Sequence, residues 1–313
     1  MNTQKEKIKF HLDKNVWSHK IMKMSPTELE EFRNLMKPLK ERSKIEIYYS
    51  PINVLELIKG MKLEKYYKNC RQEIRLADRI SNKHFLEYPW HHSQRIAAWF
   101  LGQPFKEPDL TFLNLCRKIA IKSYQEIEHE IQPIHNLLNR WINEWVDDLN
   151  SIISGFREKL GLENISKSML LKVKEYWVKQ LAPKRKQRMW IAFCDHFSLS
   201  PQLKDYPSTS VYDNFHSFRY WVDYRLAFEN KLIFENKMVE SGDYLDWEQT
   251  VYLNIMDYFV TEDKNLISIF QECGNEEMHG RTISFDEFIV CLKGELPPKR
   301  APDTTTEKWY PAQ

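Results

Sequence analysis

The feature that most constrains the fold is a pattern found at both ends of this 313-residue chain, a short apolar run that leads into an aspartate. Near the N-terminus, Ile8-Lys9-Phe10-His11-Leu12 alternates apolar and polar residues before Asp13. Near the C-terminus, Tyr258-Phe259-Val260 is followed by Thr261-Glu262-Asp263. Alternation at period two and short apolar runs are typical of strands. Each strand would therefore place an aspartate at its C-terminal end.

Caps and apolar spacing predict further elements beside these strands. Ile45 to Tyr49 forms a second predicted strand, and Ser50 as N-cap with Pro51 in the first turn begins a helix. Glu56 lies in the second turn of that helix. Because strands and helices then alternate at both ends of the chain, we expect an α/β fold with a mostly parallel sheet and helices on both faces.

The C-terminal part follows the same alternation. A helix is expected from about Tyr244 to Met256, and a second helix after Asp263 should end at Gly274 as C-cap. A last strand near Arg281 to Ser284 and a helix from Phe285 to Leu292 complete the series. Two acids, Asp243 and Asp246, stand at the start of the first of these helices.

Acids at strand ends suggest a metal centre. Ligands of open parallel sheets bind outside the carboxyl ends of the strands, so Asp13 and Asp263 should reach the same edge. Carboxylates gathered there repel one another unless a cation is bound. An all-oxygen site suits Mg²⁺ or Mn²⁺, which can activate a water and offset charge on a leaving oxygen. The expected reaction class is phosphodiester hydrolysis.

Three short motifs resemble the PIN-like nuclease superfamily. Leu12-Asp13-Lys14-Asn15 is similar to the L-D-x-N motif of the family's first strand, and the segment from Ser50 to Leu57 is similar to its second motif, whose acid is Glu56. Asp246, followed by the strand that leads into Thr261-Glu262-Asp263, fits the third acid and the T-x-D motif. Asp243 is a rival for the third position.

The resemblance implies a three-layer α/β/α core and a Mg²⁺- or Mn²⁺-dependent endoribonuclease acting on single-stranded RNA. Asp13, Asp246 and Asp263 would hold metal, Glu56 would act with them in catalysis, and Asn15 and Thr261 would orient the acids. Bacterial members of the superfamily often act as toxins, so a role as a toxin or phage-defence effector, with an antitoxin or other protein as partner, is a family-level expectation. The motifs cover only about residues 6–65 and 240–295.

These residues also have simpler interpretations. Asp13 and Asp263 could be helix N-caps, Asp243 and Asp246 could favour the positive end of their helix, and Glu56 could be a solvated helix residue or a salt-bridge partner. A haloacid-dehalogenase-like phosphatase is a poor alternative, because it requires an aspartate where this chain has Asn15. A non-catalytic PIN-like protein that presents its helical insertion to a partner is the stronger alternative.

The chain between the two halves is predicted to be helical. We expect a discontinuous core, 1–65 and 236–296, a helical insertion, 66–235, and a weakly ordered tail, 297–313. Two basic stretches in or beside the insertion could guide RNA. One follows a helical face and comprises Lys59, Lys62, Lys65, Lys68, Arg71, Arg75 and Arg79. The other runs from Lys172 to Arg188 and includes Lys184, Arg185 and Lys186 as well as Arg188. A solvated charged face is the alternative for either.

Composition agrees with these expectations but does not select an activity. The formal net charge is +2, so any basic surface must come from local clustering. The chain has 5 cysteines without a C-x-x-C pair, which favours reduced thiols in a cytoplasmic protein. No apolar run is long enough for a membrane span or a signal-peptide core. The adjacent pairs His91-His92 and Cys194 with His196 are poor zinc ligands, because neighbouring side chains diverge on a helix.

Overall fold

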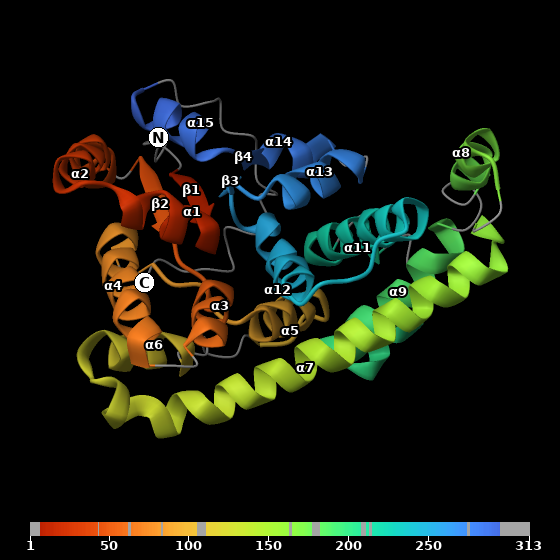
Figure 1. Ribbon diagram of the computed structural model, residues 1–313, viewed down its shortest axis with the longest axis horizontal. Helices are drawn as coiled ribbons and strands as arrows, with labels where there is room; N and C mark the ends of the chain where they lie inside the picture. Colours follow the sequence, from red (N-terminus) through yellow and green to blue (C-terminus); the bar gives the residue numbers. More distant parts are fainter. Residues whose placement is uncertain are drawn as a thin grey trace.

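The computed structural model describes residues 7–42, 44–61, 64–82, 84–104, 111–162, 165–176, 182–207, 211–212, 215–273 and 276–294. A small sheet at one end is surrounded by helices, and one long helix runs along the molecule (Figure 1). The strands are β1 (Ile8–Leu12), β2 (Ile45–Tyr48), β3 (Tyr258–Val260) and β4 (Thr282–Ile283). The helices of the N-terminal part are α1 (Lys14–His19), η1 (Ile21–Lys23), α2 (Pro26–Glu41), α3 (Pro51–Gly60) and α4 (Glu64–Ser81).

The central helices are α5 (Pro89–Phe100), α6 (Thr111–Ile121), α7 (Tyr124–Lys159), α8 (Lys167–Tyr176), α9 (Ala182–His196), the short 3-10 helix η4 (Pro201–Asp205) and α11 (His216–Glu235). The C-terminal helices are α12 (Asp243–Glu248), the 3-10 helix η5 (Gln249–Asn254), α13 (Lys264–Glu272), α14 (Glu276–Arg281) and α15 (Phe285–Leu292). The helical middle expected from the sequence is thus present in the described residues between α4 and α11.

The four strands form one parallel sheet in the order β2-β1-β3-β4. In the central pairs, Phe10 of β1 lies opposite Ile47 of β2 and Tyr258 of β3. The predicted α/β class with a parallel sheet is confirmed. Because β1 and β3 are neighbours, the N-terminal and C-terminal parts of the chain meet at the centre of the sheet, with both strands running in the same direction.

Alternating residues of the strands face two apolar clusters. Phe10 and Leu12 belong to the first cluster, which also contains Ile45, Ile47, Val260 and side chains of α2, α4, α6 and α15. Tyr48 and Phe259 belong to the second cluster, which contains side chains of α5, α9, α11 and α13. Burial of both faces explains why the strands are apolar and short, and why each is followed by a helix that covers the sheet.

Two predicted elements differ in extent from those observed. The expected helix from Tyr244 to Met256 is α-helical only to Glu248 and continues as η5. Thr250 donates its side-chain hydroxyl to the Trp247 carbonyl at 2.7 Å, a local bond that competes with regular α-helical geometry. The last strand is limited to Thr282–Ile283, because Arg281 still belongs to α14. Gly274 and the predicted tail, 297–313, lie outside the described residues.

The predicted division at residues 65 and 236 stays a prediction, but the packing is continuous across it. Ile74 of α4 and Ile119 of α6 share the first cluster with the strands, and Phe228 of α11 shares the second with Phe259. In the part of the chain that the structure describes, no helix combines the length and apolar character needed to cross a membrane.

Candidate active site

Asp13 lies at the centre of the sheet's C-terminal edge. Its backbone N–H donates to the Val260 carbonyl at 2.9 Å, which continues the β1–β3 pairing beyond both strands. Its side chain is 3% exposed. One carboxylate oxygen accepts from the Lys14 N–H at 2.7 Å, and the other accepts from the Thr261 hydroxyl at 2.7 Å. The Asp13 carboxylate is therefore held by groups from both ends of the chain.

Thr261 and Asn15 connect the strand ends around this carboxylate. The Thr261 oxygen accepts from the Asp263 N–H at 3.0 Å and from the Asn15 side-chain amide at 3.3 Å. Asn15 also accepts the Glu262 N–H at 3.2 Å. Side chains from L-D-x-N and T-x-D thus bind each other directly, in the arrangement in which Asn15 and Thr261 would orient Asp13.

Both aspartates are also helix caps. Asp13 is the N-cap of α1, and Asp263 is the N-cap of α13, where one carboxylate oxygen accepts from the Asn265 N–H at 2.8 Å and the Leu266 N–H at 3.0 Å. The interpretation of Asp13 and Asp263 as helix N-caps is therefore correct. It leaves the second oxygen of Asp263 for other contacts and does not account for the deeper acids beside them.

Glu56 is delivered to this edge by the first turns of α3. Asn53 is fully buried; its side chain accepts from the Ser50 N–H at 3.0 Å and donates to the Leu12 carbonyl at 3.2 Å, which fixes the start of α3 against the end of β1. Burial and then the nearby Asp13 charge raise the pKa of Glu56 to about 8. Within the described part of the chain, its Oε2 atom has no hydrogen-bond partner. Glu56 is therefore not a solvated helix residue.

Asp246 and Asp243 come from α12 and differ in their surroundings. Burial, followed by the charges of Asp13 and Glu56, raises the pKa of Asp246 well above its ordinary value. Burial raises the pKa of Asp243 to about 6, and its carboxylate accepts from the Glu240 N–H at 2.6 Å in its own loop. Asp246 therefore lies within electrostatic reach of the acids from the N-terminal half, whereas the Asp243 carboxylate is bound by the preceding loop and is affected by the charge of Asp263.

Lys59 fixes the segment before α12 against α3. Its ammonium donates to the Ser241 carbonyl at 3.1 Å and to the Ser241 hydroxyl at 2.9 Å. Its charge also lowers the pKa of Glu56 and Asp243, against the larger effect of burial. One of the predicted RNA-contacting cations thus stabilises the approach of two acidic segments.

Glu73 of α4 is an acid that the sequence analysis did not identify. It is 4% exposed, and burial raises its pKa to about 7. Its charge in turn raises the pKa of Glu56. The apolar spacing of Tyr67, Cys70, Ile74 and Ala77 puts Glu73 on the buried side of α4, and this was the signal available in the sequence.

The donor chemistry of this edge fits a hard divalent cation. All the acids are oxygen donors, the charges of neighbouring acids raise the pKa of Asp13, Glu56 and Asp246, and Glu56 carries a buried oxygen that the described residues leave unsatisfied. In the present side-chain positions, no three His, Cys, Asp or Glu residues of the described chain are arranged to hold one metal ion. Asp13, Asp246 and Asp263, with Glu56, are the residues that could hold it.

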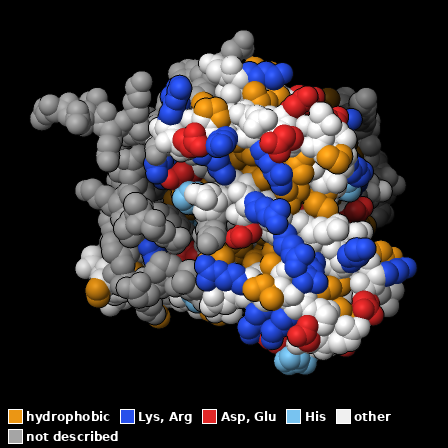
Figure 2. Space-filling view, turned by 90° about the vertical axis from the view of Figure 1, so that its left-hand side faces the viewer, with side chains coloured by type: hydrophobic (Ala, Val, Ile, Leu, Met, Phe, Trp, Pro, Cys, Tyr) orange, Lys and Arg blue, Asp and Glu red, His pale blue; other side chains and the backbone are white. Residues whose placement is uncertain are grey.

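The basic face predicted for α4 is partly used inside the fold. Arg71 and Arg75 donate to the Ala120 carbonyl at 3.1 and 2.6 Å, where they cap the end of α6. Lys65, Lys68 and Arg79 are exposed, and Lys62 lies outside the described residues. Figure 2 shows the side of the molecule that carries α2, α4 and α6, with many Lys and Arg side chains among Asp and Glu.

The second basic stretch has three different environments. Arg185 is mostly buried and pairs with Glu229, which also accepts from Arg225 at 2.5 Å. The Lys186 ammonium lies 3.6 Å from the centre of the Tyr212 ring, and Arg188 is exposed. The Lys184 side chain lies outside the described residues. Arg185 therefore has an internal partner, whereas Arg188 is exposed like Lys65, Lys68 and Arg79 of α4.

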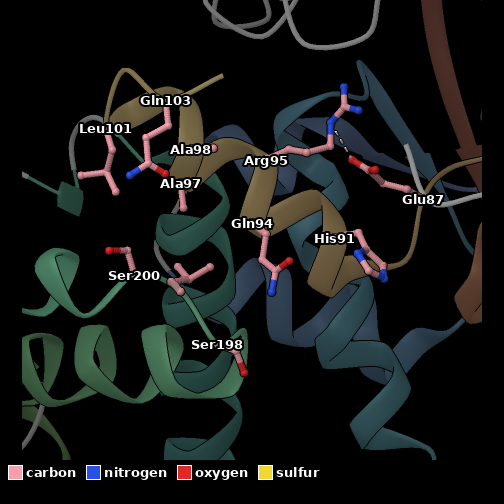
Figure 3. Close-up of a pocket in the computed structure, with 11 residues that line it drawn as sticks. Glu87, His91, Gln94, Arg95, Ala97, Ala98, Leu101, Gln103, Ser198 and Ser200 are labelled. Atoms are coloured by element: carbon pink, nitrogen blue, oxygen red, sulfur yellow. Dashed lines mark ion pairs between the residues drawn. The ribbon is translucent and has the colours of Figure 1, made fainter. Parts of the chain in front are cut away.

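A separate cavity of about 390 Å³ lies between α5 and the segment after α9. Figure 3 shows His91, Gln94 and Gln103 on one side of it and Ser198 and Ser200 on the other, with the Arg95–Glu87 ion pair at its edge. Its lining includes none of the acids at the strand ends.

His92, His196 and Cys194 have contacts inside the fold. The buried His92 contacts the Asn254 side chain at 3.0 Å, and His196 pairs with Glu248. Cys194 is fully buried in the second cluster. These contacts agree with structural roles for the three residues.

Comparison of the chain with protein-family models, curated proteins and solved structures finds no match.

Proposed function

We propose that this chain is a PIN-like, divalent-metal-dependent endoribonuclease. The observation that carries the proposal is the gathering of Asp13, Glu56 and Asp246 from three separate segments. The charge of Asp13 raises the pKa of Glu56, and the charges of Asp13 and Glu56 raise the pKa of Asp246. A fold that only needed to be stable would gain by replacing such acids with neutral residues, because buried like charges without a cation are unfavourable. Acids whose pKa is raised by burial and by neighbouring charges are typical of functional sites.

The roles follow from the positions of the acids. Asp13, Asp246 and Asp263 would hold Mg²⁺ or Mn²⁺, which when bound offsets charge on the phosphate and lowers the pKa of a water. Thr261 and Asn15 keep the Asp13 carboxylate in one orientation. A bound cation would favour the ionised form of Glu56, which could then accept a hydrogen bond from the attacking water and help to align it.

The proposed substrate is single-stranded RNA. The exposed cations of α4, Lys65, Lys68 and Arg79, would contact the phosphate backbone, and Arg188 of α9 is a further exposed cation. The resemblance of the three motifs supports RNA as the substrate class, and the weak overall charge leaves local clusters to supply the attraction.

The test is cleavage of a fluorescently labelled single-stranded RNA by the purified chain in Mg²⁺ or Mn²⁺. Asp13→Asn keeps the size of the side chain and should reduce cleavage at least about 100-fold. Asp147→Asn, an exposed position on α7, is the matched control and should cleave at the wild-type rate. Wild-type cleavage by Asp13→Asn would refute the proposed function.

A further inference from the structure

A further cavity, of about 310 Å³, lies beside the long helix α7, where α5, α9 and α12 approach it (Figure 1). Aromatic side chains form most of its wall, namely Tyr88, Trp90, Trp141, Trp145, Phe197 and Tyr244. A cavity of this size is near the lower limit of small-molecule sites, roughly 300–1,000 Å³, so it suits a small ligand.

One face of α7 supplies two of these rings together with two acids. Trp141, Glu144, Trp145 and Asp148 follow the spacing i, i+3, i+4 and i+7, which places them on the same side of the helix. Trp141 is 38% exposed, so packing does not close this part of the face. The centres of the Trp145 and Tyr244 rings are 5.4 Å apart and their planes meet at 69°. These two rings therefore form a corner of the wall.

The described residues that line the cavity include three acids and no Lys or Arg. Glu248 of α12 is the buried one, and it pairs with His196 of α9. After burial, the charge of Glu248 is the next cause that raises the pKa of Tyr88 and of Tyr244. The inner part of the wall is therefore electronegative.

Glu144 and Asp148 add two exposed negative charges to the same wall. No ion pair in the described part of the chain involves either residue. Like charges four positions apart on a helix repel each other, so a cation in the cavity would reduce this repulsion. The same charges would disfavour an anionic ligand.

The fold already places a cation against one of these rings. The Arg225 guanidinium, which is not among the described lining residues, lies 5.3 Å from the centre of the Trp145 ring and pairs with Glu229. The face of an aromatic ring attracts cations because its π electrons make it negative. Several such rings around one cavity, with acids beside them, favour a cationic ligand.

We propose that this cavity binds a small quaternary ammonium ion that carries no carboxylate, such as choline. Rings that surround an ammonium group are the usual means by which proteins recognise such ions. A primary ammonium is strongly hydrated and a metal ion needs oxygen, nitrogen or sulfur ligands, whereas N-methyl groups pack directly against rings. The described lining includes none of Asp13, Glu56, Asp246 and Asp263, so this binding does not depend on the proposed nuclease activity.

Isothermal titration calorimetry of the full chain tests the proposal with three ligands. Choline should bind. The uncharged isostere of choline, in which a carbon atom replaces the nitrogen, keeps the shape and should bind at least about tenfold more weakly because it lacks the charge. Glycine betaine should also bind at least about tenfold more weakly, because its carboxylate would be repelled by the acids of the wall.

Variants of α7 test the position of the ligand. Trp141→Leu removes a ring but keeps an apolar side chain, and it should weaken choline binding about tenfold. Tyr66→Leu, an exposed ring of α4 outside the described lining, is its control and should bind choline as wild type does. Asp148→Asn should weaken choline binding about threefold without changing binding of the isostere. Asp147→Asn, the neighbouring exposed acid, should change neither.

Three outcomes would overturn the proposal. Equal affinities for choline and its uncharged isostere would mean that the cavity is only an apolar hollow. Absence of binding at millimolar choline would mean that it has no such ligand. Wild-type affinity in Trp141→Leu would place choline elsewhere on the protein. Should Trp141→Leu alter the fold, the comparison of Asp148→Asn with Asp147→Asn decides, and equal choline affinities in those two variants would contradict the site.

Discussion

The Thr261 hydroxyl donates a 2.7 Å hydrogen bond to Asp13 Oδ2, although 248 positions separate the two residues in the chain. Thr261 is fully buried, and its oxygen also accepts from the Asp263 N–H. A single hydroxyl therefore connects Asp13, which follows β1, with Asp263, which follows β3. Its removal should affect both the fold and the orientation of the site.

Thr261→Val should destabilise the protein by about 1–3 kcal/mol, because it leaves the Asp13 carboxylate and the Asp263 N–H without this buried partner. Denaturation in guanidinium chloride measures the effect. Thr261→Ser keeps the hydroxyl and should lose only the contribution of one methyl group, about 1 kcal/mol. Equal midpoints for wild type and Thr261→Val would show that the bond is not stabilising.

Glu56→Gln should raise the melting temperature of the metal-free protein at pH 8. The neutral amide avoids the burial penalty and the repulsion by Asp13 that raise the pKa of Glu56 to about 8. The same variant should lose most of the stabilisation that wild type gains from Mn²⁺. Differential scanning calorimetry with and without Mn²⁺ measures both effects. A lower melting temperature without metal would mean that Glu56 has a stabilising partner.

Stability without metal should fall as the pH rises from about 4 to about 8. The ordinary pKa values of Asp13 and Glu56 are 3.8 and 4.5, and in the folded chain they are about 6 and about 8. The folded state thus holds these protons more tightly than the unfolded state, so deprotonation penalises folding, and the penalty is complete above pH 8.

The measurement is urea denaturation in the presence of a chelator at several pH values. Between pH 6 and 8, Glu56→Gln should show a shallower decline than wild type. Because protons compete with metal for the same oxygens, the apparent Mn²⁺ affinity of wild type should rise over that interval. A Mn²⁺ affinity independent of pH would contradict the assignment of these acids as ligands.

Charge reversal at Lys65, Lys68 and Arg79 should weaken RNA binding and make it less dependent on salt. Each lost phosphate contact reduces the slope of log affinity against log salt by about 0.7 for a single strand. Fluorescence anisotropy in an Asp13→Asn background measures binding without cleavage. Reversal of the exposed Arg140, Lys159 and Lys237, which lie outside both basic stretches, is the matched control. An equal loss in both triple variants would indicate only a general charge effect.

The local pattern was sufficient to predict the strands and the ends at which Asp13 and Asp263 lie. Leu12 followed by Asp13, and Ser50 followed by Pro51, are strong boundary signals because each combines an apolar strand end with a helix cap. The strand from Tyr258 to Val260 was predicted in the same way, because its apolar residues lead to Asp263, which caps the next helix. These signals depend on neighbouring residues alone, and the structure has the corresponding elements.

Long-range packing set the features that were not predicted. Apolar spacing puts Glu73 on the buried side of α4, but its contact with Ser18 of α1 depends on the packing of separate segments. Arg71 and Arg75 cap α6, a helix whose position relative to α4 could not be read from spacing. The different surroundings of Asp243 and Asp246 depend on the folded chain, since the charges of Asp13 and Glu56 are named causes of the raised pKa of Asp246 alone.

The 36-residue helix α7 contributes Ile127 and Ile131 to the first apolar cluster and Leu149 and Ile153 to the second. Such a helix spans about 54 Å, so one rigid rod joins the two hydrophobic interiors. Deleting the middle of this chain to obtain a minimal catalytic fragment would remove buried side chains from both apolar clusters. Attempts to shorten the protein should instead trim loops, and heating should melt it in a single cooperative step.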